Sequence, residues 1–380
     1  MSKKLYLFAF SVPIIFLFAF LLKSKDTDKV SKDIDKVNNI STTKTLPKLE
    51  KVGEKIFPLD SLTIPKTTML QITKENNKFL LYYLNMMDNT IRIFDYESGK
   101  EKQIIDFKGR EENIATLMSF YVHNSDSLFI YTNEELILCN SKLEIINKIE
   151  VKGKTKAWMT PSAGMPLTFK DNKIYGLAIQ LTDDEYSHTL EIDLATKEVK
   201  ELPIDILPQK KLKGGYWGTG YDLVLYDYIH HLGKWVYSFQ NDENIYLADF
   251  KSKEFKTIKA ETTSFGILTP PYAKKADMEK AKKRDEPISF YNSINTYDGL
   301  VTSPYTNYIV RMVSPSKEQG QAIRIASLII LNEKLEKSNE YLINADEYTI
   351  GMSFITEEGL HIARTVKTDE NNLIFDIFKI

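Results

Sequence analysis

The 380-residue sequence predicts an all-β protein, and three observations lead to that prediction. Short runs rich in Tyr, Phe, Ile and Leu alternate with clusters of Asn, Asp, Gly and Ser, which is typical of many short strands joined by tight turns. The composition is 43% hydrophobic and 12% aromatic, which suffices for a buried core. A strand–turn–strand pattern also recurs along the chain, which indicates a repeated β-sheet unit.

The recurring pattern is a β-rich run that ends in Asp or Asn, a few turn residues, and a Glu that opens the next run. Because Asp and Asn side chains accept backbone N–H groups across tight turns, each copy predicts a β-hairpin. Successive copies are separated by 45, 53, 56, 83 and 44 residues, close to the length of a propeller blade apart from the fourth interval. The runs end at Asp95, Asn140, Asp193, Asp249, Asn332 and, in shortened form, Asp376.

These six copies predict a six-bladed β-propeller over residues 54–380, with seven blades or a β-sandwich pair as alternatives. The interval of 83 residues contains AKKADMEKAKKRDE at 273–286, which predicts a polar helical insertion. Because the last copy lies close to the C-terminus, its blade lacks a fourth strand. The β-rich run Glu54–Asp60 is predicted to supply that strand and so to close the ring.

Residues 1–22 are predicted to form a hydrophobic helix, either a signal peptide or a membrane anchor. Two lysines precede Leu5–Leu22, a run of 18 residues that is hydrophobic apart from Ser11 and Pro13. As a helix the run would span roughly 27 Å, just short of a bilayer core. Neither a small-residue cleavage site nor a cysteine follows it, which favours an uncleaved anchor. More lysines follow the run than precede it, which weakens the charge argument for an external C-terminus.

Residues 23–53 are predicted to form a polar linker. Lysine and aspartate alternate there, and the few apolar residues cannot repay the entropy cost of folding. Val30, Ile34 and Val37 lie at helical spacing, so a short amphipathic turn is the alternative. The prediction is therefore a propeller tethered outside the cytoplasm, in the cell envelope, either anchored through residues 5–22 or periplasmic.

Charge and cysteine content exclude several classes of function. The chain carries 50 Lys and Arg against 52 Asp and Glu, without a block of like charge, so we expect no nucleic-acid partner. A lone cysteine, Cys139, excludes an internal disulfide framework and thiolate-built metal sites, and we expect it to be a small buried hydrophobe. Signatures of zinc proteases, nucleophile elbows and phosphate-binding loops are absent from the sequence. We accordingly predict no catalytic residue, no metal ligand and no cofactor.

The most unusual stretch is GGYWGTGYD at 214–222, between the third and fourth copies. Glycines permit open backbone conformations, and Tyr and Trp offer flat apolar surfaces with a polar edge, which suits sugar rings or peptide side chains. The alternative is an aromatic loop that only packs on its neighbours. From this stretch, the residues after it and the surroundings of the insertion, the predicted ligand-binding residues are Tyr216, Trp217, Tyr221, Asp222, Tyr228, His230, Trp235, Tyr272 and Arg311.

Two longer segments carry a resemblance to a known family. FPLDSLT at Phe57–Thr63, YYLNMMDNTIRIFDYESGK at Tyr82–Lys100 and the recurring hairpins together resemble the uncharacterised Bacteroidetes-type propeller family catalogued as domain of unknown function 4221. That family is similar to wider six-bladed, TolB-like propellers. The resemblance implies a propeller outside the cytoplasm and supplies no catalytic residue. Its members often carry a cysteine after the hydrophobic segment, where this chain has Leu22-Lys23-Ser24-Lys25.

The function predicted from these features is a membrane-associated binding or protein-interaction module, whose ligand is an unknown protein, peptide or glycan. The alternative is a metal-dependent propeller hydrolase or lactonase with a site in the central channel, for which Asp222, Asp227 and His230 are the candidates. A third possibility is a structural partner in an envelope assembly, which an exposed apolar patch would indicate.

Overall fold

A computed structural model describes residues 46–47, 49–107, 117–132, 134–155, 158–159, 161–180, 186–203, 224–240, 242–249, 254–265, 296–314, 324–365 and 371–380. The chain divides into two compact units, Met1–Thr45 and Leu46–Ile380, and all described residues belong to the second. The predicted N-terminal helix, most of the predicted linker and the predicted insertion at 273–286 therefore lie outside the described residues. Within the described ranges, no helix has the length and apolar character needed to cross a bilayer.

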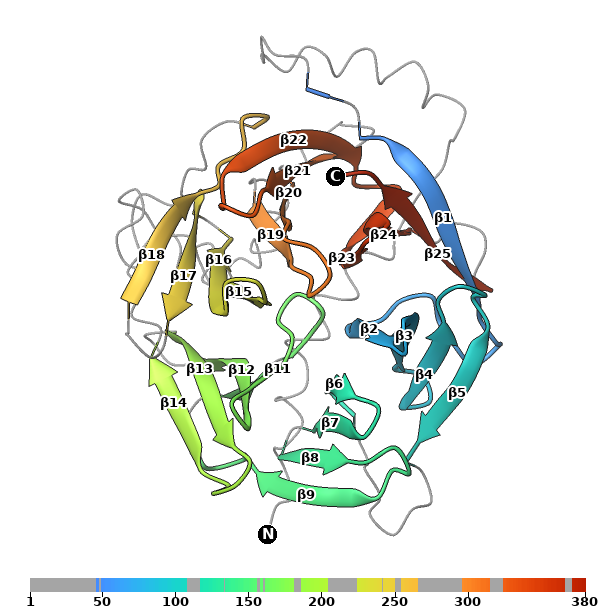
Figure 1. Cartoon of the computed structure of the whole chain (residues 1–380), viewed down its shortest axis with the longest axis vertical. Helices are drawn as coiled ribbons and strands as arrows, with labels where there is room; N and C mark the ends of the chain where they lie inside the picture. Colours follow the sequence, from blue (N-terminus) through green and yellow to red (C-terminus); the bar gives the residue numbers. More distant parts are fainter. Residues whose placement is uncertain are drawn as a thin grey trace, which may run out of the picture. The chain divides into compact units, whose positions relative to one another are not determined.

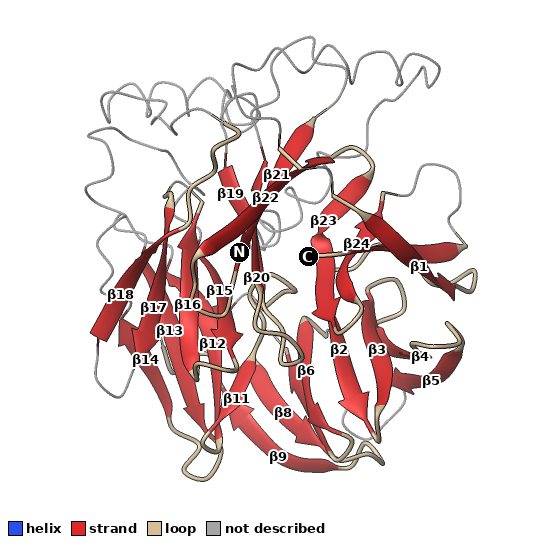
Figure 2. Cartoon of the chain, turned by 45° about the horizontal axis from the view of Figure 1, so that its top comes forward, coloured by secondary structure: helices blue, strands red, loops and turns tan. Residues whose placement is uncertain are grey.

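The unit Leu46–Ile380 contains six antiparallel sheets arranged as blades around an axis (Figure 1). Every regular element in the described ranges is a strand (Figure 2). The fold is a six-bladed β-propeller, as the sequence predicts. The strands of each blade are given from the axis outwards. Blade one comprises β2 (Leu70–Glu75), β3 (Lys78–Asn85), β4 (Thr90–Asp95) and β5 (Glu101–Asp106), and blade two comprises β6 (Ser119–Asn124), β7 (Ser127–Tyr131), β8 (Glu135–Cys139) and β9 (Ile145–Glu150). Blade three comprises β10 (Trp158–Met159) with β11 (Thr168–Lys170), then β12 (Lys173–Gln180), β13 (Tyr186–Asp193) and β14 (Val199–Pro203). Blade four comprises β15 (Val224–Ile229), β16 (Lys234–Phe239), β17 (Asn244–Asp249) and β18 (Glu254–Lys259); blade five β19 (Thr296–Val301), β20 (Ile309–Ser314), β21 (Ile325–Leu331) and β22 (Lys337–Asn344); blade six β23 (Tyr348–Thr356), β24 (Gly359–Arg364), β25 (Asn372–Phe378) and β1 (Lys51–Pro58).

The two faces of the ring carry different loops. In each blade the strands are antiparallel, so the turns between first and second strands and between third and fourth strands share one face. We call it the turn face, and it points toward the viewer in Figure 1. The connections between blades and the turns between second and third strands lie on the opposite face, which we call the connection face.

The Asp and Asn residues of the repeated pattern stabilise the turns between third and fourth strands. Oδ1 of Asp95 accepts the N–H of Ser98 at 2.8 Å, and Oδ1 of Asp193 accepts two backbone N–H groups. Asn140 and Asn332 each accept two backbone N–H groups in the same way. The hairpins predicted at these four positions are therefore confirmed.

The core of the described unit consists of six clusters of buried hydrophobic residues. Each cluster draws its residues from two neighbouring blades, so the apolar faces of the sheets pack against each other around the ring. Ile91 and Ile130, for example, meet between blades one and two, where Cys139 is also buried. Apolar burial between adjacent blades is thus the main force that holds the ring together.

Blade six combines the two ends of the unit, because β1 is its outermost strand. Phe57 of β1 pairs with Leu373 of β25, is fully buried, and packs against Phe94 of blade one. β1 begins at Lys51, inside the predicted linker. Lys51 pairs with Phe378 of β25 and its ammonium lies 2.8 Å from the carboxylate of Asp376, so both contacts extend the strand beyond its predicted start.

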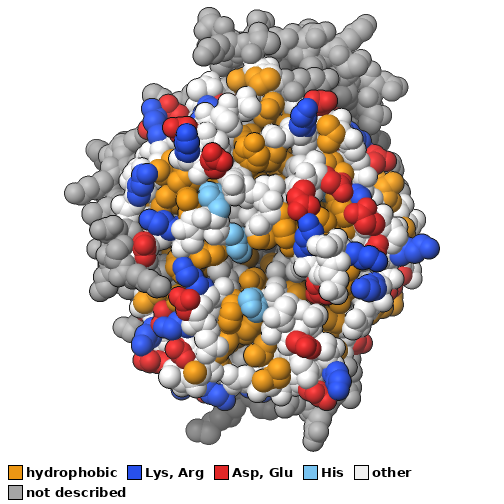
Figure 3. Space-filling model, viewed as in Figure 1, with side chains coloured by type: hydrophobic (Ala, Val, Ile, Leu, Met, Phe, Trp, Pro, Cys, Tyr) orange, Lys and Arg blue, Asp and Glu red, His pale blue; other side chains and the backbone are white. Residues whose placement is uncertain are grey.

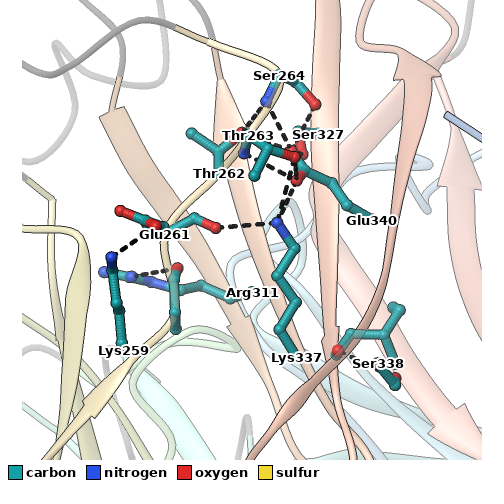
Figure 4. Close-up of polar contacts among 12 residues, drawn as sticks. Lys259, Glu261, Thr262, Thr263, Ser264, Arg311, Ser327, Lys337, Ser338 and Glu340 are labelled. Carbon is teal, nitrogen blue, oxygen red and sulfur yellow. Dashed lines mark hydrogen bonds and ion pairs between the residues drawn. The ribbon is translucent and has the colours of Figure 1, made fainter. Parts of the chain in front are cut away.

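Blades four and five are joined through a buried carboxylate, Glu340 of β22, whose side chain is 1% exposed (Figure 4). It accepts hydrogen bonds of 2.5–3.2 Å from the N–H and hydroxyl groups of Thr262–Ser264, which follow β18. Oγ of Ser327 and Nζ of Lys337 donate at 2.6 and 2.5 Å. Burial raises the pKa of Glu340, but these hydrogen bonds outweigh burial and hold the pKa well below its usual value.

The turn at Gly99 packs closely against β1. Gly99→Ala is therefore expected to destabilise the protein by roughly 2–4 kcal/mol. Gly99 has φ +68°, and a Cβ there would lie 2.1 Å from the carbonyl oxygen of Ile56. Gly153 has a similar φ of +75° with nothing within 4 Å of an added Cβ, so Gly153→Ala is expected to cost only about 1 kcal/mol. Urea midpoints of the two variants measure the difference. Equal losses would show that contact with β1 does not matter.

Candidate functional site

Five of the nine predicted ligand-binding residues lie outside the described part of the chain: Tyr216, Trp217, Tyr221, Asp222 and Tyr272. The other four fall into two places. Tyr228, His230 and Trp235 lie together on the β15–β16 hairpin at the turn face. Arg311 lies between blades four and five.

Arg311 of β20 is 0% exposed, so it does not face solvent. Its Nη1 donates to the carbonyl oxygens of Glu243 and Ala260 at 2.8 and 2.9 Å, and its Nη2 donates to carbonyls within 239–244. The ring of Tyr297 lies 3.6 Å from the guanidinium carbon. Burial lowers the pKa of Arg311 to about 10, which still leaves it charged at neutral pH. The guanidinium of Arg311, on blade five, donates hydrogen bonds to carbonyls of blade four and so holds the two blades together. The prediction that Arg311 binds a ligand is therefore corrected, because its role is structural.

Tyr228, His230 and Trp235 form an aromatic group with Lys170 at the end of β11. The Tyr228 ring lies 5.1 Å from the rings of both His230 and Trp235. Nζ of Lys170 lies 5.2 Å from the centre of the Tyr228 ring and 5.0 Å from that of Trp235, and it donates to the carbonyl of Gly233 at 3.0 Å. Tyr228 and Lys170 are half-buried, Trp235 is buried and His230 is exposed. Blades three and four thus bring a cation and three rings to the turn face.

A second aromatic group lies on the other side of β11. The exposed ring of His123, on β6, lies 4.2 Å from the ring of Phe169. Phe169 and Lys170 are adjacent in a strand and so point to opposite sides of it, which places β11 between the two groups. Figure 3 shows histidine side chains near the centre of this face, among hydrophobic ones. We name the set of six residues the turn-face cluster: His123, Phe169, Lys170, Tyr228, His230 and Trp235.

The imidazoles of the cluster are neutral at pH 7. Burial lowers the pKa of His123. Burial also lowers the pKa of His230, and the neighbouring His231 lowers it further. Each neutral ring offers one N–H donor and one acceptor nitrogen to a bound molecule. At neutral pH the full positive charge of the cluster is therefore on Lys170.

Asp227 lies next to the cluster on β15. Burial raises the pKa of its carboxyl to about 6, although the N–H groups of Tyr228 and Thr302 donate to it at 2.8 and 3.0 Å. The hydroxyl of Thr302 donates in turn to the carbonyl of Tyr228 at 2.9 Å. These bonds tie blade four to blade five beside the cluster and hold the Asp227 carboxylate toward blade five.

A hairpin from blade three spans the axis of the ring. The inner strand of this blade is interrupted between β10 and β11, and the chain between them turns at Ala163 and Gly164. The N–H of Ala163 donates to the carbonyl of Thr68 in blade one at 2.8 Å, and the carbonyl of Gly164 accepts the N–H of Tyr226 in blade four at 3.4 Å. Because blades one and four are opposite each other, the hairpin crosses the axis (Figure 1).

A second segment, 302–308, extends from blade five toward blade one on the turn face. Oγ of Ser303 donates to the carbonyl of Ile355 in blade six at 2.8 Å. The ring of Tyr305 then lies 4.9 Å from that of Phe79 in blade one. With one segment across the axis and another across the turn face, we expect a ligand to bind on the surface of the turn face and not along an open channel.

No group of three or more His, Cys, Asp or Glu side chains among the described residues is arranged to hold a metal ion. Of the three candidates for a metal-dependent hydrolase, Asp222 lies outside the described ranges. Asp227 accepts N–H groups, and His230 packs edge-on against Tyr228. What the described part of the site offers is ring surfaces, hydrogen bonds and one cation.

Comparison with known proteins places the chain in a family. The model for "Domain of unknown function (DUF4221)" matches residues 48–340. The chain belongs to this family. A DUF4221 member from Bacteroides vulgatus has a solved structure that is 23% identical, with a TM-score of 0.74 over 87% of this chain and 98% of that one. A putative exported protein from Bacteroides fragilis is 12% identical, with a TM-score of 0.53 over 87% and 96% of the two chains. No curated protein matches this chain.

Half of the turn-face cluster of this DUF4221 protein was missed in the sequence: His123, Phe169 and Lys170. Tyr228, His230 and Trp235 stand out because they are aromatic neighbours along the chain. Lys170 belongs to another blade, and its only local signal is its position before a turn, where Asp171 and Asn172 both have positive φ. That signal predicts an exposed strand end, which many lysines in this chain share.

Proposed function

We propose that this DUF4221 protein is a binding module that recognises a protein, peptide or glycan through the turn-face cluster. The observation that carries the proposal is that two groups of side chains from three blades lie on either side of β11 at the turn face. Ring faces combined with a few placed polar groups are the common composition of ligand sites. Because the side chains lie at the ends of paired strands, their spacing is set before a ligand arrives, which lowers the entropy cost of binding.

We further propose that the module is held at the outer side of a membrane. The hydrophobic run 5–22 supports this location, since its length approaches that of a bilayer-spanning helix. The polar residues that follow would serve as the linker between this run and the propeller. The similarity in fold to a putative exported protein is compatible with this location.

Closure of the ring by β1 belongs to the same proposal, because a closed ring keeps the three blades of the cluster in register. Two contacts support it besides the strand pairing of β1 with β25. Nη2 of Arg364 lies 2.6 Å from the carboxylate of Glu54 on β1 and 2.7 Å from that of Asp376 on β25. The guanidinium thus binds both strands at the point where the two ends of the unit meet.

A screen of the full-length protein against peptide and glycan arrays tests the proposal. Tyr228→Ala is expected to weaken the best wild-type interactions at least about tenfold, since it removes the ring that contacts His230, Trp235 and Lys170. The matched control is Met87→Ala, which removes a 69% exposed apolar side chain on the connection face and should leave binding unchanged. Loss of binding with Met87→Ala but not with Tyr228→Ala would place the site on the other face and overturn the proposal.

A further inference from the structure

We infer that the turn-face cluster recognises a carboxylate, carried by an acidic peptide, and that Lys170 is the residue that binds it. The inference rests on the proposed binding function and adds the chemistry of the ligand. It starts from a lysine that is half-buried among rings, at the end of the inner strand β11.

Lys170 has no acidic partner within ion-pair distance among the described residues. Among the described residues its ammonium donates one hydrogen bond, to the uncharged carbonyl of Gly233 at 3.0 Å, and an ammonium group has three donors. Lys173, three residues on in the same hairpin, is different, because its Nζ lies 2.5 Å from the carboxylate of Glu191. The ammonium of Lys170 therefore retains both charge and donors for a bound anion.

The rings beside Lys170 hold its charge in place. Tyr228 and Trp235 lie 5.2 and 5.0 Å from Nζ, so the long side chain is restrained before a ligand binds. Apolar rings also exclude water, and a charge–charge hydrogen bond gains strength where water is excluded. Asp227 of blade four, which precedes Tyr228 on β15, accepts the N–H of Thr302 at 3.0 Å and makes no ion pair with Lys170 in the described part of the chain.

A single lysine beside the neutral imidazole of His230 suits a singly charged anion. Phosphate groups in proteins are typically held by a planar arginine or by several backbone N–H groups together, and the turn-face cluster has neither. The N–H of the neutral His230 ring, which contacts the same Tyr228 ring as Lys170, matches the second oxygen of a carboxylate. A carboxylate is thus the anion that this set of donors fits best.

The accessible apolar surface favours a peptide over an acidic sugar as the carrier. Trp235 is only 4% exposed, so the largest ring of the cluster offers no open face on which a sugar could stack. The exposed apolar group beside the cluster is instead Leu232, in the β15–β16 turn, at 38% exposure. Leu232 beside the ammonium of Lys170 would fit a peptide in which an acidic residue is flanked by apolar ones.

Two matched peptide libraries test the inference with the full-length protein. One holds N-acetylated, C-amidated hexapeptides that each contain one Asp, and the other has Asn in its place. The wild type is expected to bind the best Asp peptides at least about tenfold more tightly than their Asn counterparts. Lys170→Met should abolish this preference, Lys170→Arg should retain most of it, and Lys173→Met should leave it unchanged.

The outcomes separate this inference from the proposed function. Equal binding of Asp and Asn peptides, lost in Tyr228→Ala, would leave the binding module in place but refute the carboxylate. Binding that neither Tyr228→Ala nor Lys170→Met alters would refute both. Preferential binding of galacturonic acid over the peptides, or displacement of the Asp peptides by inorganic phosphate, would overturn the assignment to an acidic peptide.

Discussion

Arg311→Met is expected to lower the free energy of unfolding by at least about 5 kcal/mol, enough to leave much of the protein unfolded. Methionine keeps the apolar length of the side chain but removes every donor. The carbonyls of Ala260 and Asp242 would then be buried without these partners, the carbonyl of Glu243 would keep only the N–H of Ala260, and Oγ of Ser238 would lose the bond from Nε at 3.0 Å. Each unsatisfied buried group costs about 1–3 kcal/mol, and the losses accumulate at a single interface between blades.

Urea unfolding of full-length variants measures the effect. Lys in place of Arg311 is expected to be intermediate, because it keeps the charge but lacks the planar fork that reaches carbonyls on several sides. The control is Arg324→Met, since Arg324 is more exposed and its pair with Asp346 at 2.9 Å should contribute no more than about 1 kcal/mol. Equal urea midpoints for Arg311→Met and Arg324→Met would show that the hydrogen bonds of Arg311 between blades four and five do not stabilise the protein.

Glu340→Gln is expected to cost about 3–5 kcal/mol at pH 7. The carboxylate of Glu340 accepts from the backbone and hydroxyls of Thr262–Ser264, from Ser327 and from Lys337. The amide of glutamine has the same shape, but its NH2 group replaces one acceptor oxygen and would face the N–H and O–H donors that surround Glu340. It also leaves the ammonium of Lys337 without its counter-charge.

The same substitution should change how stability depends on pH. The pKa of Glu340 is depressed in the folded protein, so its contribution is fully present above the ordinary glutamate pKa near 4.3 and is lost as the pH falls toward the folded value. Melting temperatures between pH 7 and pH 3 should thus fall more steeply for the wild type than for Glu340→Gln. Glu336→Gln, at an exposed residue bonded to Asn332, should follow the wild type. Parallel curves for all three proteins would contradict a charged Glu340.

The sequence predicted the repeating unit because the signals for it are local. At Asn140 the side chain accepts N–H groups two and four residues further on, so the turn is encoded within five residues. The alternation of apolar residues in the neighbouring strands acts over similarly short distances. Six copies of such a signal are enough to predict both the strands and the number of blades.

Arg311 shows where reasoning from neighbouring residues fails. Its strand, Ile309–Ser314, is otherwise almost entirely apolar, and a lone arginine there is equally consistent with a buried, satisfied group and with a residue that faces a ligand. Its carbonyl partners lie 51–72 residues away. Only the packing of blade four against blade five decides between the two roles.

The sequence by itself determined the β-hairpins, their turns and the six-fold repeat of this DUF4221 protein, because each depends on residues a few positions apart. Tertiary structure alone decided which side chains form the turn-face cluster. Lys170 and Tyr228 are 58 residues apart in the chain, and His123 lies 47 residues before Lys170. They meet because apolar packing between blades brings the ends of inner strands together, and that geometry is a property of the ring and not of any one segment.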